Sequence, residues 1–122
     1  MYTIKVDKRL GLVEANLGGM MTTEEVATYV ADLKRAFIEH RLHSYAMVID
    51  VSSCPIQSQD MIQAMGQHMA TMPKARALAI VTGSSLARMQ VRRLFTQPYA
   101  RITANVCEGR SWVLYGTEPV TH

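Results

Sequence analysis

Apolar and polar residues alternate along the start of the chain, as they do in a strand with one buried face. The apolar positions lie two residues apart on either side of a turn: Tyr2, Ile4, Val6, Val13, Ala15 and Leu17. The turn between the two runs has the sequence Asp7-Lys8-Arg9-Leu10-Gly11. This pattern predicts a β-hairpin.

After Gly18-Gly19 the apolar spacing changes to three or four residues, which is typical of a helix. Thr22 followed by Glu25 is a capping box, in which the hydroxyl accepts from a helix amide and the carboxylate reaches back. The apolar stripe that follows consists of Val26, Val30, Leu33 and Phe37. We expect this helix to end near His40.

Strands and helices then alternate three times. The runs Tyr45 to Val51 and Ala77 to Val81 are nearly all apolar, which predicts strands buried on both faces, and Arg101 to Val106 predicts a shorter strand. The predicted helices are a methionine-rich one from Ser58 to Pro73, one from Leu86 to Phe95 with Leu86 on its apolar side, and one from about Glu108 to Tyr115.

This order requires crossovers between parallel strands, with the first strand antiparallel at an edge. We therefore expect a single α/β domain over residues 1–116, with a five-stranded, mixed but mostly parallel sheet and about four helices. Residues 117–122 are predicted to form a flexible C-terminal tail.

The composition is that of an ordinary globular protein: 48% of the 122 residues are hydrophobic and 19% are charged. No apolar run is long enough to cross a bilayer. The first residues lack the apolar segment of a secretory signal, so we expect a cytoplasmic protein. Cys54 and Cys107 are too few for a disulfide framework and are interpreted as free thiols.

The net charge of +3 is small, and its one dense cluster is Arg88, Arg92 and Arg93. No aromatic residues are interleaved with these arginines on strands, so nucleic-acid binding is disfavoured. A homodimer is expected only from the general frequency of paired small domains.

The sequence contains no constellation that predicts catalysis. It has no Gly-x-Ser-x-Gly elbow, no Walker lysine and no convincing set of four metal ligands, so we expect no enzyme activity, no cofactor and no metal. An enzyme that uses the loop from Cys54 to Ser58 is kept as an alternative.

Met61, Met65, Met69 and Met72 repeat at intervals of four, four and three and so share one helix face. Flexible thioethers suit a pocket for an acyl chain or another apolar ligand. A core stripe is the more usual role of such a row, and a dimer surface is a third possibility.

The turn Thr82-Gly83-Ser84-Ser85 follows a buried strand and begins a helix, so its amides can bind an anion. Arg88 and Arg92 follow one and two turns later. Ser84, Ser85, Arg88 and Arg92 together could hold a phosphate or a lipid headgroup. The alternative is that the serines are helix caps and the arginines are solvated or paired with acids.

The strand VIDVSS, the turn AIVTGSS, the helix ARMQVRRLF and the closing helix with Trp112 resemble the SpoIIAA-like or STAS family. The pattern is most similar to the branch of uncharacterised bacterial STAS proteins that resemble CRAL-TRIO lipid-transfer domains. The resemblance covers nearly the whole chain. It implies a binding or regulatory domain of the SpoIIAA-like fold.

Regulatory members of that family carry a phosphorylated serine in an Asp-Ser-Ser/Thr-Gly motif after the central strand. Here the corresponding segment reads Ile56-Gln57-Ser58-Gln59-Asp60, without the preceding acid and the following glycine. Ser58 is thus either a phosphoacceptor or, as serines at this place more often are, a helix N-cap.

We therefore predict a non-catalytic STAS-like module that binds a small apolar or amphipathic, lipid-like ligand. Met61, Met65 and Met69 would contact its apolar part, and Ser84, Ser85, Arg88 and Arg92 its charged end. The alternative is a switch of the anti-anti-sigma type, in which Ser58 controls binding to a regulatory protein partner.

Overall fold

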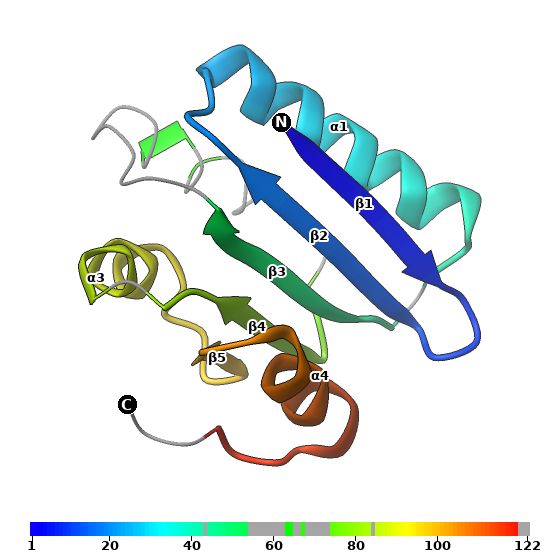
Figure 1. Ribbon diagram of the computed structural model, residues 1–122. Helices are drawn as coiled ribbons and strands as arrows, with labels where there is room; N and C mark the ends of the chain where they lie inside the picture. Colours follow the sequence, from blue (N-terminus) through cyan, green and yellow to red (C-terminus); the bar gives the residue numbers. More distant parts are fainter. Residues whose placement is uncertain (43, 54–62, 65–66, 68–73, 84, 120–122) are drawn as a thin grey trace.

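The computed structural model describes residues 1–42, 44–53, 63–64, 67, 74–83 and 85–119 (Figure 1). The strands are β1 (Tyr2–Asp7), β2 (Leu12–Gly18), β3 (Ala46–Ser53), β4 (Ala77–Val81) and β5 (Ala100–Thr103). The helices within these ranges are α1 (Thr23–Glu39), α3 (Ser85–Leu94) and α4 (Val106–Tyr115). Gln63, Ala64 and Gln67 are also helical, while the rest of the predicted methionine-rich helix lies outside the described residues.

The five strands form one sheet in the order β1-β2-β3-β4-β5. β1 and β2 pair antiparallel, and every other neighbouring pair is parallel. The predicted fold class, a single α/β domain with a mixed and mostly parallel sheet, is thereby confirmed. The crossovers from β2 to β3 and from β4 to β5 step in the same direction, so right-handed connections place α1 and α3 on the same face.

The larger part of the core lies between the sheet and that pair of helices. It joins Ile49 and Ile80 of the central strands to Leu33 and Phe37 of α1 and to Val91 of α3. The opposite face carries a smaller cluster under α4. β3 and β4 are buried on both faces, which explains their nearly continuous apolar sequence.

The predicted capping of α1 is confirmed, since the Thr22 hydroxyl accepts a hydrogen bond from the Glu25 amide at 3.1 Å.

The prediction of a last strand reaching Val106 is wrong: β5 ends at Thr103. The Asn105 side chain accepts from the Glu108 amide at 2.8 Å and begins α4 at Val106, two residues before the predicted start. Val106 therefore belongs to the first turn of α4 rather than to a strand.

The first residues after α4 contact the edge of the sheet. Both carboxylate oxygens of Glu118 accept hydrogen bonds from Arg101 of β5, at 2.9 and 3.0 Å. The Arg101 guanidinium also lies over the Trp112 ring, 4.3 Å from its centroid. This pairing lowers the pKa of Glu118 and raises that of Arg101.

Two buried tyrosines are expected to make the fold sensitive to alkaline pH. Burial raises the pKa of Tyr45 to about 12 and that of Tyr29 further still, whereas in an unfolded chain both ionise near pH 10. Above pH 10 the unfolded state therefore releases protons that the folded state retains. Stability falls as the pH rises, by about 1.4 kcal/mol per pH unit for each tyrosine.

Urea unfolding at pH 9 and pH 11 tests this expectation. We expect the free energy of unfolding to be about 2 to 3 kcal/mol lower at pH 11, and Tyr29→Phe to reduce that difference by roughly half. Tyr115→Phe is the matched control, because Tyr115 is 81% exposed. Equal losses in the wild type and in Tyr29→Phe would contradict the assignment to Tyr29.

Candidate functional site

The parallel strands β3, β4 and β5 end at one edge of the sheet, where α3 begins. Open α/β sheets commonly bind ligands at this edge. Thr82 follows β4 and is buried, and its backbone N–H donates to the Thr103 carbonyl at 3.0 Å. Gly83 is exposed, and a Cβ added to it would meet no atom within 4 Å. The turn before α3 is thus fixed at Thr82 and open to solvent one residue later.

One side of α3 packs against the core. Val91 is buried, Ala87 and Arg88 are half-buried, and Phe95 just after the helix packs on the same cluster. These positions recur at intervals of three and four residues, as a packed helix face requires. Arg92 and Arg93 in the last turn also favour the helix, because they face the negative end of its dipole.

The other side of α3 is exposed and mixes apolar with cationic side chains. Its members are Ser85, Leu86, Met89, Arg92 and Arg93. Leu86 is 59% exposed and Met89 is 54% exposed. Leu86, which the sequence placed on the apolar side of this helix together with Val91, lies more than a third of a turn away from Val91 around the axis and faces solvent.

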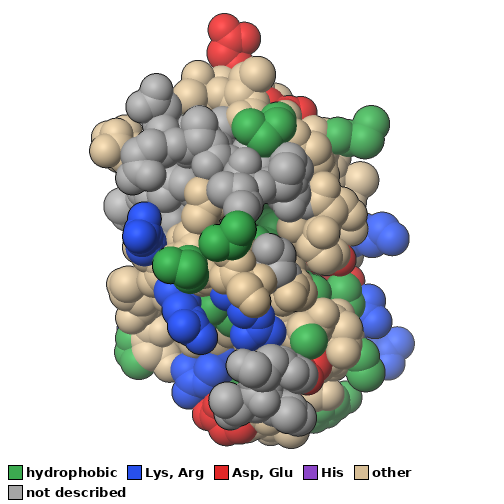
Figure 2. Space-filling model, turned by 60° about the vertical axis from the view of Figure 1, so that its left-hand side comes forward, with side chains coloured by type: hydrophobic (Ala, Val, Ile, Leu, Met, Phe, Trp, Pro, Cys, Tyr) green, Lys and Arg blue, Asp and Glu red, His purple; other side chains and the backbone are tan. Residues whose placement is uncertain are grey.

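The charge of this surface is uncompensated within the part of the chain that the structure describes. α3 contains three arginines and no acidic residue, and no described carboxylate forms an ion pair with Arg88, Arg92 or Arg93. On the face of the molecule that carries α3, Figure 2 shows Lys and Arg side chains gathered next to hydrophobic ones. We refer to Leu86, Met89, Arg92 and Arg93 as the α3 surface.

The residues that the sequence predicted for a ligand site fall into two groups. Ser85, Arg88 and Arg92 all lie in α3: Ser85 and Arg92 are on its exposed side, and Arg88 is half-buried on the side that packs against the core. Met61, Met65, Met69, Ser84 and the possible phosphoacceptor Ser58 lie outside the described residues. The structure therefore places only the cationic part of the predicted site.

Sequence reasoning missed the exposed Met89 and Leu86. A helical projection centred on Val91 places both of them opposite the core, and that signal was available in the spacing. Asp50 lies within β3, and its Oδ1 accepts from the amide and the hydroxyl of Ser52 in the same strand, at 3.0 and 2.5 Å.

The chain was also compared with known proteins. No protein-family model matches it, and no curated protein matches it either. The resemblance to the SpoIIAA-like family stays a prediction. None of the helices within the described residues is both long enough and apolar enough to cross a membrane.

Proposed function

We propose that this protein is a non-catalytic, STAS-like binding module and that it holds an anionic amphiphile on the α3 surface. The observation that carries the proposal is the exposed mixture of two arginines, a leucine and a methionine on one helix side. Guanidinium groups bind carboxylate or phosphate through paired hydrogen bonds. Leu86 and Met89 offer apolar area beside them for a hydrocarbon chain.

The burial of α3 supports a binding role for these side chains rather than a packing role. Val91 already anchors the helix in the core, so the α3 surface is not needed to attach it. Large exposed apolar side chains next to unpaired cations are typical of surfaces that meet another molecule. The alternatives based on Ser58 and on the loop from Cys54 rest on residues outside the described ranges, and no contact of the described residues favours them.

Titration with dodecanoate below its micellar concentration tests the proposal, with dodecyltrimethylammonium as a probe of equal chain length and opposite charge. We expect dodecanoate to bind at least tenfold more tightly. Arg92→Gln combined with Arg93→Gln should reduce its affinity at least tenfold, because the charge-assisted hydrogen bonds are lost. Met89→Ser should reduce it about threefold through lost apolar contact.

Matched controls are available elsewhere on the surface. Arg9→Gln removes an exposed arginine from the hairpin turn, and Met20→Ser removes a methionine that is 58% exposed. Both are expected to leave dodecanoate affinity within twofold of the wild type. Equal binding of the two amphiphiles, or equal effects of the α3 variants and these controls, would contradict the proposal.

A further inference from the structure

On the face of the sheet that carries α4, the described residues leave β1 and much of β2 uncovered. α4 packs on β3, β4 and β5, on the face opposite α1 and α3. Its Gly109 lies so close to the sheet that a Cβ there would be 3.3 Å from the Ala79 Cβ. β1 and most of β2 extend beyond the helix, and on this side they carry polar residues except for Leu12, which is buried in the cluster under α4. The uncovered area therefore belongs to β1, β2 and the near side of β3.

Two cross-strand rows of side chains fill this area. In the first, Thr3 of β1 pairs with Asn16 of β2, which pairs with Asp50 of β3. In the second, Lys5 pairs with Glu14, and Glu14 with Val48. Residues that share a row lie side by side on adjacent strands. The sheet thus brings together groups from three strands that are up to 47 positions apart in the sequence.

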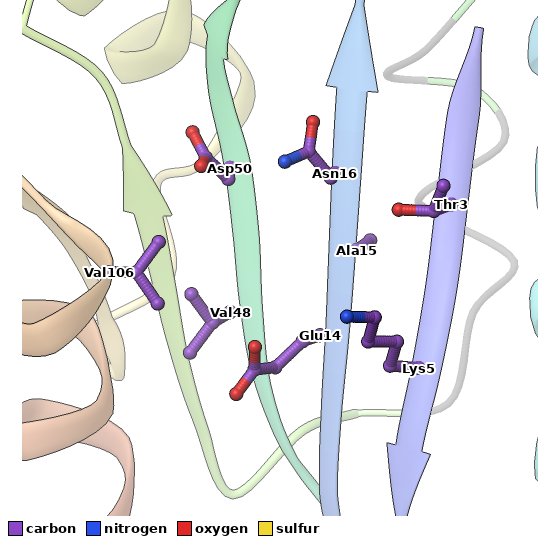
Figure 3. A pocket seen from close by; sticks show the side chains of 8 residues that line it. All are labelled: Thr3, Lys5, Glu14, Ala15, Asn16, Val48, Asp50 and Val106. Carbon is purple, nitrogen blue, oxygen red and sulfur yellow. The ribbon is translucent and has the colours of Figure 1, made fainter.

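These rows surround a hollow of about 100 Å³. It is lined by Thr3, Lys5, Glu14, Ala15, Asn16, Val48, Asp50 and Val106. Figure 3 shows Thr3, Asn16 and Asp50 side by side across the strands, with the Lys5 side chain leaning over β2 below them. Val106, in the first turn of α4, forms an apolar wall beside Val48.

The charges around the hollow are only partly paired. Glu14 is neutralised by Arg110 of α4, whose guanidinium donates to both of its carboxylate oxygens, at 2.6 and 2.9 Å. Asp50 uses Oδ1 for Ser52, and its Oδ2 accepts no hydrogen bond from a described residue. The side chains of Thr3, Lys5 and Asn16 likewise form no hydrogen bond or ion pair within the described ranges. Among the described residues, the Lys5 ammonium and Asp50 Oδ2 are therefore left to bind a ligand.

We propose that this hollow binds a small zwitterion of the α-amino acid class. The ligand carboxylate would accept from the Lys5 ammonium, and the ligand ammonium would donate to Asp50 Oδ2. Asn16 and Thr3 lie between these two groups and can hydrogen-bond either end. Lys5 lies on β1 and Asp50 on β3, and these two strands are about 10 Å apart. The long Lys5 side chain covers part of this distance, and a ligand with adjacent opposite charges can cover the rest.

The same observations disfavour ligands of a single charge. Glu14 and Arg110 neutralise each other, so a simple anion would meet the carboxylate of Asp50 and a simple cation would meet the ammonium of Lys5. The hollow is small, with a volume of about 100 Å³, and it is open to solvent on one side. The small amino acids glycine, alanine and serine are therefore the first ligands to test. The hollow is distinct from the α3 surface, which lies on the other side of the sheet, so each proposal stands without the other.

Nitrogen–proton correlation NMR of the full chain, titrated with alanine, tests the inference. We expect shifts concentrated at Thr3, Lys5, Asn16 and Asp50, including the Asn16 side-chain amide. Propanoate and ethylammonium carry only one of the two charges and should bind at least tenfold more weakly than alanine. Lys5→Gln and Asp50→Asn should each lower alanine affinity at least tenfold, because each removes one charge-assisted contact.

Asp50→Asn retains the oxygen that accepts from Ser52, so the strand end should keep its structure. Lys8→Gln, in the exposed hairpin turn, and Glu39→Gln, at the end of α1, are the charge-matched controls and should bind alanine as the wild type does. The inference is overturned if propanoate or ethylammonium binds as tightly as alanine. It is equally overturned if alanine causes no shifts. It is also overturned if Lys5→Gln and Asp50→Asn bind alanine as tightly as the wild type, once thermal denaturation has shown that both variants are folded.

Discussion

Replacing Ile80 by alanine is expected to lower the free energy of unfolding by about 3 to 4 kcal/mol, as is usual for large-to-small substitutions at sites that cannot collapse. Ile80 is only 1% exposed and lies in β4, between Ile49 of β3 and Ile102 of β5. It belongs to the cluster that joins α1 and α3 to the sheet. Because strands flank it on both sides, the backbone cannot move inward to fill the cavity.

The expected loss is a large share of the roughly 5 to 15 kcal/mol that stabilises a typical domain. Urea unfolding at neutral pH measures it, and the midpoint of thermal unfolding should fall by about 10 °C or more. Ile38→Ala makes the same chemical change on α1, where the side chain is 77% exposed. That variant should differ from the wild type by less than about 0.5 kcal/mol. A similar cost in the two variants would show that the core is not packed as described.

Replacing Gly109 by valine is expected to lower the free energy of unfolding by about 3 kcal/mol, at the upper end of the usual range for overpacking. A Cβ at this position would lie 3.3 Å from the Ala79 Cβ, 3.3 Å from the Thr103 Oγ1 and 3.4 Å from the Val48 Cγ1. The two further methyl groups of valine have no free volume, since β3 and β4 lie directly beneath. The helix must therefore move away from the sheet.

Trp112 reports that movement, because it is the only tryptophan and its indole N–H lies 3.2 Å from the carbonyl oxygens of Leu78 and Tyr99. We expect a red-shifted emission in Gly109→Val together with the lower stability. Gly109→Ala should stay within about 1 kcal/mol of the wild type, because the helix propensity gained offsets the closer contact. Tyr115→Val, on an exposed side chain of the same helix, controls for the introduction of a β-branched residue. Wild-type stability in Gly109→Val would contradict the close approach of α4.

Local patterns predicted most of the secondary structure. β4 occupies the predicted residues, and the hairpin and the Thr22 cap form as expected. These features depend on the alternation of side chains or on groups three residues apart, and such relations are fixed within a short segment. The error at the start of α4 has the same origin: Val106 looked like the end of a strand, although Asn105 and Glu108 have the spacing of a helix cap.

The candidate sites were less accessible from the sequence. The arginines of α3 could be identified as a cluster, but the exposure of Leu86 depends on which side of the helix meets the core. The hollow was not predicted at all. Lys5, Asn16 and Asp50 come from three segments, and nothing in a single segment indicates that they share one face of the sheet.

The sequence by itself determined the order of the elements, the class of the fold and the two strands that are buried on both faces. Side-chain periodicity and caps are local, and right-handed crossovers leave few ways to arrange such an order. Only the tertiary structure decided that α4 covers β3, β4 and β5 but not the β1–β2 hairpin. The small residues Ala46, Ala79 and Gly109 allow the helix to approach closely there, and close packing at one place leaves the polar side chains of β1 and β2 uncovered.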